Sequence, residues 1–210
     1  TVATTAAEGM SLIKSVEVEI GGQRIDKQYY RFMHGHARVF KSTDELATLA
    51  SLTRTVVAVA TKVMIPLNFW FCNNPGLALP LVALQYHEVK INVEFNANLM
   101  KSALIGGAAP GTFTTASIWA NYVYLDTDER RRFAQISHEY LIEQVQFTGD
   151  ESVTSASTSK KINLAFNHPC KELIWVVHKS GSGVDKFDFG RNAADTPTIT
   201  SALLQLNGHD

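Results

Sequence analysis

Residues 86–95 read Tyr-His-Glu-Val-Lys-Ile-Asn-Val-Glu-Phe, and this stretch decides the fold class. Apolar side chains and one histidine occupy the odd-numbered positions, whereas Glu, Lys and Asn occupy the even-numbered positions from 88 to 94. Successive side chains of a β-strand point to opposite faces of the sheet. The alternation therefore predicts a strand with one face against a core and the other in water, as in an antiparallel sheet.

The same alternation recurs along the chain. Val16, Val18 and Ile20 alternate with polar residues before Gly21-Gly22 ends the run. Further candidate strands are bounded by Gly, Pro, Asn, Ser or Thr, and they cover residues 55–60, 63–71, 113–125, 138–147, 160–166, 171–178 and 199–206. Many short strands at this spacing are typical of an all-β sandwich. Pro66 removes one backbone donor, which predicts a sheet edge or a bulge there.

Two capping boxes predict short helices between the strands. Ser42-x-x-Glu45 opens the first, and Asp126-x-x-Glu129 opens the second. The second helix follows a long candidate strand and precedes a new run of strands, so we place a domain junction there. We expect a first domain over residues 1–125, a helical connection over 126–137 and a second domain over 138–210.

Charge and cysteine content narrow the function classes. The 210 residues carry a net charge of -1, and direct binding of nucleic acid needs clustered basic residues, so it is not expected. The compact basic run Arg130-Arg131-Arg132 follows three acidic residues, which is typical of a charged, solvated helix. Cys72 and Cys170 match no metal or redox spacing and are expected to be buried thiols.

The pair His34 and His36 is the first candidate metal site. Two imidazoles two residues apart on a β-scaffold resemble the His-x-His of cupins, but the rest of that pattern fails. The cupin pattern needs Gly six residues before the first His, where this chain has Gln28. It needs Glu four or five residues after the second, where Phe40 and Lys41 stand. A functional metal site also needs a third ligand and groups that orient it.

Three other patterns are candidate sites. Gly181-Ser182-Gly183 lacks the Gly-Lys-Ser/Thr ending of a phosphate loop and is interpreted as a flexible loop. Glu139 and Glu143 share one face of a candidate strand, like a glycosidase dyad, but a wet strand face explains them equally well. The aromatic residues of the strand segments are expected to fill the core. The sequence thus predicts no catalytic, cofactor-binding or metal-binding residue.

One stretch is distinctive as a whole. Residues 65–89 read Ile-Pro-Leu-Asn-Phe-Trp-Phe-Cys-Asn-Asn-Pro-Gly-Leu-Ala-Leu-Pro-Leu-Val-Ala-Leu-Gln-Tyr-His-Glu-Val. Further stretches accompany it in order, at residues 20–29, 126–133, 138–145, 167–175 and 204–209. Together they resemble the major capsid proteins of nucleocytoplasmic large DNA viruses. Phycodnaviruses, iridoviruses and mimiviruses are viruses of this group.

That resemblance implies a double jelly roll, which is two tandem eight-stranded antiparallel sandwiches with short helices in loops. Residues 1–125 would be the greater part of the first jelly roll, without its earliest strands. Residues 138–210 would be the opening strands of the second. The chain begins without Met and stops at Asn207-Gly208-His209-Asp210, where Asn-Gly would open a turn. We therefore expect a piece of a longer polypeptide.

The resemblance also implies the function of a structural protein and not of an enzyme. Three copies would form a homotrimeric, pseudo-hexagonal capsomer, and capsomers would tile the icosahedral shell of a double-stranded DNA virus. Minor or cement capsid proteins would be further partners, and an inner viral membrane would lie nearby without being spanned. The implied location is the virion, after assembly in the cytoplasm of the infected cell.

Two other function classes remain open from the residues alone. A lectin-like jelly roll could hold glycans with its aromatic side chains and long loops. A cupin-type metalloenzyme could use His34 and His36.

Overall fold

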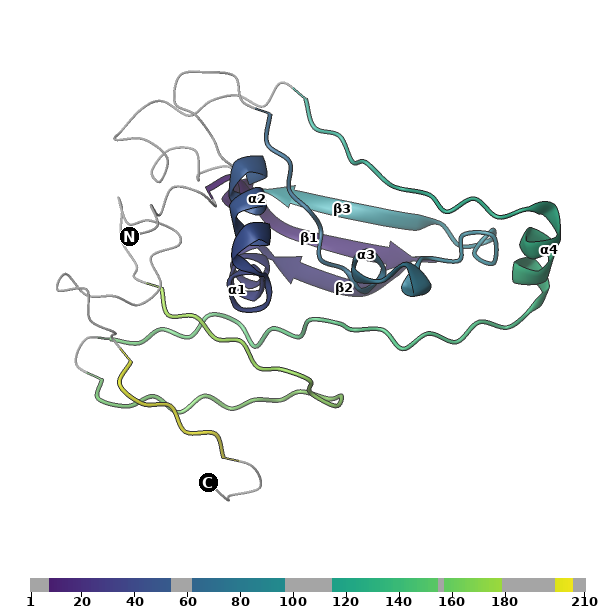
Figure 1. Ribbon diagram of the computed structural model, residues 1–210. Helices are drawn as coiled ribbons and strands as arrows, with labels where there is room; N and C mark the ends of the chain where they lie inside the picture. Colours follow the sequence, from purple (N-terminus) through teal and green to yellow (C-terminus); the bar gives the residue numbers. More distant parts are fainter. Residues whose placement is uncertain (1–7, 54–61, 97–114, 155–156, 179–198, 206–210) are drawn as a thin grey trace.

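The computed structural model describes residues 8–53, 62–96, 115–154, 157–178 and 199–205. In chain order the elements are η2 (Glu8–Leu12), β1 (Ile13–Ile20), β2 (Gln23–Tyr29), α1 (Tyr30–Phe40), α2 (Thr43–Thr53), α3 (Trp70–Asn73), η3 (Pro75–Leu77), β3 (Val89–Phe95) and α4 (Thr127–Gln135). Helices α1 and α2 lie at one end of the sheet (Figure 1). Two long extended stretches run out to α4 and back from it (Figure 1). Within the described ranges, no helix has the length and apolar character needed to cross a bilayer.

An antiparallel sheet of order β2-β1-β3 forms the centre of the fold. Strand β1 is in the middle, and Val16 pairs with Gln28 on one side and with Val93 on the other. Gly21 and Gly22 link β1 to β2 with φ values of 61° and 83°. A two-residue hairpin turn of this kind needs positive φ at both central positions, which glycine adopts without steric cost.

The core forms where α1 packs against the sheet. Val16, Val18 and Phe69 have no exposed surface, and they cluster with Met33 and Trp70. Helix α1 buries residues 30, 33, 34 and 37. This i, i+3, i+4, i+7 spacing gives a helix one face toward a core. The apolar residues at positions 89, 91 and 93 of β3 pack partly buried against the same cluster.

Several elements confirm the sequence predictions. The alternation over residues 86–95 becomes β3, and the run that ends at Ile20 becomes β1. The box at Ser42 begins α2, where the Ser42 backbone N–H donates to Glu45 Oε2 at 2.8 Å. The Asp126 side chain caps α4 by accepting from the Glu129 backbone N–H at 2.8 Å. Periodicity and caps are local signals, and they placed these elements correctly.

Several other expected strands are not formed among the described residues. No strand is formed by the described residues 63–69, 115–125, 138–147, 160–166, 171–177 and 199–205, and in the predicted range 171–178 only His178 forms a single β-bridge. They run extended, but no ladder partner lies beside them among the described residues, and a strand requires one. The range over 55–60 lies outside the described residues. The first part of 63–71 is extended, and Trp70 then begins α3.

Helix and cysteine expectations need correction too. The sequence did not predict the eleven-residue α1, so the described fold contains more helix than an all-β class implies. Gly35 inside α1 weakens the local helix signal, and packing against the sheet overrides it. Cys72 and Cys170 are both exposed, not buried. Cys72 lies in α3. Cys170 lies in an extended stretch, and no other described residue packs over its side chain.

We predict that Phe69→Ala lowers the free energy of unfolding by about 3–5 kcal/mol, because the fully buried ring leaves a cavity. The matched control is Tyr86→Ala, whose side chain is 89% exposed and whose loss should cost less than about 0.5 kcal/mol. Urea unfolding followed by tryptophan fluorescence measures both. Equal costs for the two variants would contradict this core.

Candidate functional site

The extended stretch that returns from α4 meets the sheet at the edge strand β2. The Val145 backbone N–H donates to Asp26 Oδ1 at 2.9 Å. Beside it, Gln144 Nε2 donates to the Ile25 carbonyl at 2.6 Å. We call this contact the junction, because it joins two parts of the chain that are 119 positions apart. Side chains carry it, whereas a continued sheet would use a backbone ladder.

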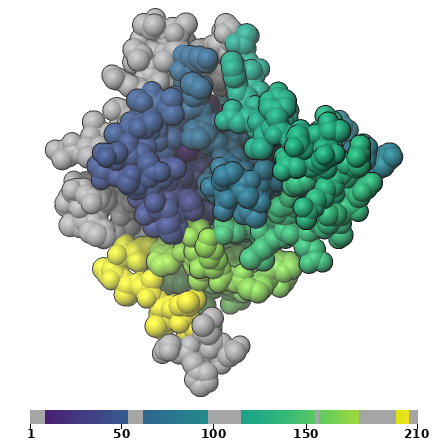
Figure 2. All heavy atoms as spheres, turned by 45° about the vertical axis from the view of Figure 1, so that its right-hand side comes forward, coloured from purple at the N-terminus to yellow at the C-terminus, as the bar shows by residue number. Residues whose placement is uncertain are grey.

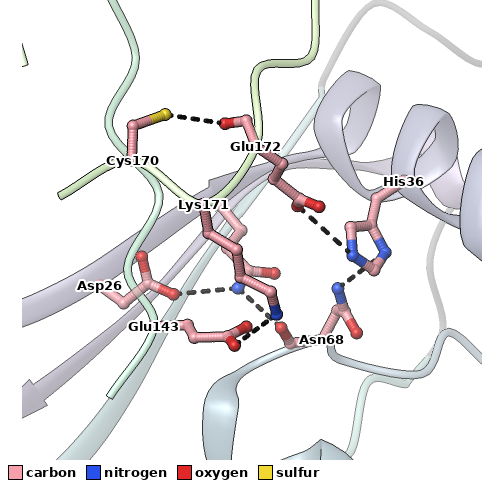
Figure 3. Close-up of polar contacts among 8 residues, drawn as sticks. Asp26, His36, Asn68, Glu143, Cys170, Lys171 and Glu172 are labelled. Atoms are coloured by element: carbon pink, nitrogen blue, oxygen red, sulfur yellow. Dashed lines mark hydrogen bonds and ion pairs between the residues drawn. The ribbon is translucent and has the colours of Figure 1, made fainter. Parts of the chain in front are cut away.

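Asp26 is the buried centre of the junction. The residue is only 3% exposed, and its carboxylate also accepts a hydrogen bond from Gln28 Nε2 at 2.9 Å (Figure 3). Gln28 Nε2 donates in turn to the Asn68 carbonyl at 2.8 Å. Burial raises the pKa of Asp26, while the hydrogen bonds from Val145, Gln28 and Lys27 lower it in part. The ionised carboxylate is therefore held by its donors at some cost in desolvation.

The raised pKa of Asp26 has a defined sign for stability. The folded chain binds this proton more tightly than the unfolded chain, whose reference pKa is 3.8. The contribution of this group to stability is therefore complete below that value. It declines as the pH rises through the raised pKa, because the buried group then ionises.

Ion pairs surround the junction at the surface. Lys171 Nζ lies 2.6 Å from Glu143 Oε1, and His36 Nε2 lies 3.7 Å from Glu172 Oε1 (Figure 3). Solvent screens the exposed Lys171–Glu143 pair, and half-buried His36, whose pKa is lowered by burial, attracts Glu172 only when it is protonated, so both contacts stabilise the fold weakly. The rings of Tyr29 and Phe147 add an apolar contact, with centroids 4.9 Å apart. These contacts mainly determine which residues of the extended stretches lie opposite α1 and β2.

A shallow hollow lies beside the junction, between the end of α1, the α3–η3 segment and the extended stretches. Its lining includes aromatic and apolar side chains from Phe40, Trp70 and Leu77. In the wall Glu143 pairs with Lys171, and Glu172 faces His36, whose pKa is lowered chiefly by burial. Because burial favours the neutral imidazole of His36, the charged groups of the lining are one ion pair and the Glu172 carboxylate, which give the hollow no positive field to attract an anion.

The two histidines of the first candidate metal site point away from each other. Residues two apart on a helix are about 200° apart around its axis, since each residue turns about 100°. His34 is 5% exposed and faces the core, whereas His36 faces Glu172 and lies 3.3 Å from Asn68 Nδ2. Among the described residues, no group of three or more His, Cys, Asp or Glu side chains could hold a metal.

The remaining predicted positions are scattered. Glu139 and Glu143 are exposed on an extended stretch, and Glu143 pairs with Lys171. Gly181-Ser182-Gly183 lies outside the described residues. Phe69 and Trp70 fill the core as expected. The expectation is wrong for several other aromatic residues, which are exposed because no second layer of described residues covers their segments: Trp119, Tyr122, Tyr124 and Trp175.

Sequence reasoning missed the junction itself. Asp26 and Gln28 lie in β2, whose residues Gln23-Arg-Ile-Asp-Lys-Gln-Tyr29 have polar side chains on both faces. A strand with no apolar face gives no alternation signal. The available signal was Gly21-Gly22, since a hairpin turn predicts a partner strand after it and makes a charged residue inside that strand noteworthy.

We predict that Asp26→Ala speeds hydrogen exchange at the Val145 amide by roughly ten- to a hundredfold, because a hydrogen bond to a buried carboxylate is lost. Asp150→Ala is the matched control from the same stretch. It removes only the exposed pair with Arg31 and should leave Val145 unchanged. Equal exchange at Val145 in the wild type and in Asp26→Ala would show that the carboxylate does not hold this stretch.

His34 should make the fold sensitive to acid. Burial, with a smaller effect of Arg38, lowers the pKa of His34 from 6.5 to about 4. The folded chain therefore binds this proton less tightly than the unfolded chain. Its stabilising contribution is present above pH 6.5 and is lost as the pH falls to about 4, on the order of 3 kcal/mol. Chemical unfolding at several pH values should show a shallower acid decline for His34→Gln, and identical slopes would contradict this assignment.

Comparison with known proteins places the chain in a family. Residues 1–126 match the family described as major capsid protein N-terminus, and residues 129–210 match the family described as large eukaryotic DNA virus major capsid protein. The major capsid protein of Pyramimonas orientalis virus is 53% identical over 212 residues, which cover 96% of this chain and 49% of the relative. That of Paramecium bursaria Chlorella virus 1 is 39% identical over 248 residues, which cover 99% and 55%.

A solved structure agrees with these relatives. The quasi-atomic model of the PBCV-1 virus capsid matches with a TM-score of 0.63 and 43% identity, over 79% of this chain and 42% of that one. The chain thus spans about half the length of the curated relatives that it matches. Because the first family match alone covers more than half of the residues and the second follows it in order, the chain belongs to the family of large eukaryotic DNA virus major capsid proteins.

Proposed function

We propose that the polypeptide carrying this sequence is a structural shell subunit of a large double-stranded DNA virus. Three copies form a pseudo-hexagonal capsomer, and the capsomers tile an icosahedral capsid. The observation that carries this proposal is the tandem order of the two capsid-protein matches, at residues 1–126 and 129–210. The likeness to a chain of the PBCV-1 virus capsid supports it.

The fold that we propose for the intact polypeptide is a double jelly roll. Residues 1–125 contribute the greater part of the first sandwich, residues 126–137 connect, and residues 138–210 open the second. Two observations support this division. The family matches meet between residues 126 and 129. Helix α4 occupies Thr127–Gln135, and an extended stretch precedes and follows it (Figure 1).

Exposed apolar side chains support the presence of further strands in the intact polypeptide. Leu141, Trp175 and Leu203 are 89%, 66% and 70% exposed, and each lies in an extended stretch. Water contact with so much apolar surface is unfavourable, by roughly 25 cal/mol for each Å². The curated relatives are about twice as long as this chain, and the other half of such a polypeptide would cover these stretches.

The proposed role needs self-recognition and no reaction chemistry. We infer a protein without catalytic, cofactor or metal residues, whose partners are its own copies and minor or cement capsid proteins. It resides in the virion after assembly in the cytoplasm of the infected cell, outside an inner membrane and without direct nucleic-acid contact. The net charge of -1 supports the last point, because binding to phosphates requires an excess of basic residues.

We predict that the intact polypeptide, purified from its native source, elutes as a species of three times its subunit mass. Light scattering after size-exclusion chromatography measures the assembled mass, and denaturing mass spectrometry of the same fraction gives the subunit mass as the control. A stable monomer at micromolar concentration would contradict the proposed capsomer.

A further inference from the structure

A line of contacts continues from the junction onto helix α1. The ring of Phe147 lies with its centroid 4.9 Å from that of Tyr29, the last residue of β2. Three positions further along, Asp150 Oδ1 lies 3.5 Å from Arg31 Nη1 in the first turn of α1. The extended stretch therefore follows β2 to its end and then meets the helix.

A second extended stretch lies against α1 with one of its faces. Glu172 Oε1 lies 3.7 Å from His36 Nε2. Ile174 Cγ2 and Val176 Cγ1 lie 3.7 Å and 3.8 Å from the position that a Cβ atom would take on Gly35. Alternate residues of an extended chain point to the same side. The even-numbered side chains from 172 to 176 therefore face the helix together.

Together these contacts join the part of the chain before α4 to the part after it. We call the contacts of residues 144–150 and 172–176 with β2 and α1 the seam. Figure 2 shows residues 160–178, in yellow-green, lying directly against the blue helical part of the chain. Both sides of the seam are described residues of this chain, so the structure itself shows what covers the outer face of α1 at Gly35.

Gly35 leaves the room that the second stretch occupies. Glycine is unfavourable inside a helix, because it loses more backbone freedom on folding than any other residue. A Cβ atom at position 35 would make ordinary van der Waals contact with Ile174 and Val176, so alanine fits. A longer side chain directed the same way would have to displace one of these two residues. The seam therefore admits only a very small residue at position 35.

We propose that β2 and α1 form the face on which the second sandwich of the same subunit docks, and that Gly35 is the positioning residue that sets how closely the two sandwiches approach. This inference rests on the proposed function, in which the parts before and after α4 belong to two sandwiches. The hydrogen bond from Val145 to Asp26 fixes the register of the contact because it is directional. Close packing at Gly35 fixes its distance. Copies that repeat one contact must present it at the same place, so a fixed angle between the sandwiches serves the proposed capsomer.

The first test introduces two cysteines across the seam of the intact polypeptide, Gly35→Cys with Ile174→Cys, after both exposed native cysteines have been replaced by serine. A disulfide needs Cβ atoms about 4 Å apart, which the contact between positions 35 and 174 allows. The matched control is Gly35→Cys with Trp175→Cys, because Trp175 lies on the opposite face and is 66% exposed. We expect oxidation to join positions 35 and 174 within one chain, with at least roughly tenfold less product in the control.

Mass spectrometry of the non-reduced protein distinguishes the outcomes of this test. A product of one subunit mass with the 35–174 disulfide supports the seam. A disulfide that joins two copies would overturn the inference, because the second sandwich would then dock on a neighbouring subunit. Equal yields for both cysteine pairs, or no disulfide in either, would overturn it as well. The readout does not depend on assembly, so a polypeptide that stays monomeric refutes the proposed capsomer while the disulfide still decides the seam.

The second test examines Gly35 itself. In the same serine background, the rate at which a maleimide labels Ile174→Cys measures how often the seam opens. Gly35→Phe should raise this rate roughly tenfold, because an overpacked contact favours the open form. Gly35→Ala should leave it unchanged, and so should Val39→Phe, which adds the same ring to α1 at a position that is 68% exposed. An unchanged rate in Gly35→Phe, or an equal rise in Val39→Phe, would refute the positioning role. Far-UV circular dichroism monitors folding, and for a misfolded variant the disulfide result decides.

Discussion

Strand β1 finds hydrogen-bonding partners on both sides, and the described structure is arranged around this pairing. One neighbour, β2, follows after only two glycines, whereas the other, β3, comes from about 75 residues further along the chain. Peptide groups taken out of water must find partners, so this long-range pairing anchors the sheet on which α1 packs. Val16 and Val18, at the centre of β1, are fully buried as a result.

The need of peptide groups for hydrogen-bonding partners also distinguishes residues 138–150 from the sheet. Residues 138–150 reach β2 through a buried carboxylate and a glutamine and reach α1 through the ion pair of Asp150 with Arg31, without a ladder. Such contacts fix the register of the stretch but leave most of its peptide groups and apolar side chains open. In the function proposed here, the open stretches gain their partners from the rest of the polypeptide and from neighbouring copies.

The sequence predicted the elements that carry a local signal. The alternation over 86–95 and the capping boxes at Ser42 and Asp126 led to β3, α2 and α4. It missed α1, where Gly35 interrupts a weak helix pattern and packing decides. It missed β2 because neither face of that strand is apolar. The glycine turn could have indicated β2 and its charged residue, but it could not indicate that Val145, 119 positions away, is the partner of Asp26.

The exposure of the aromatic residues could not be predicted from the local sequence either. An aromatic residue in an alternating run indicates burial in the assembled state of a protein, but it does not say which chain buries it. Phe69 is covered by its own chain, and Tyr124 is not. Likewise, the spacing of His34 and His36 indicates a shared metal site only if the two residues lie on a strand. On a helix the two side chains diverge.

A density map of the assembled shell that resolves individual side chains tests the central claim most directly. We expect residues 13–20 to keep residues 89–95 as neighbours, and residues 138–147 to lie in a ladder with strands from the remainder of the polypeptide. A shell in which residues 138–147 stay unpaired, or in which this chain is absent, would contradict the account.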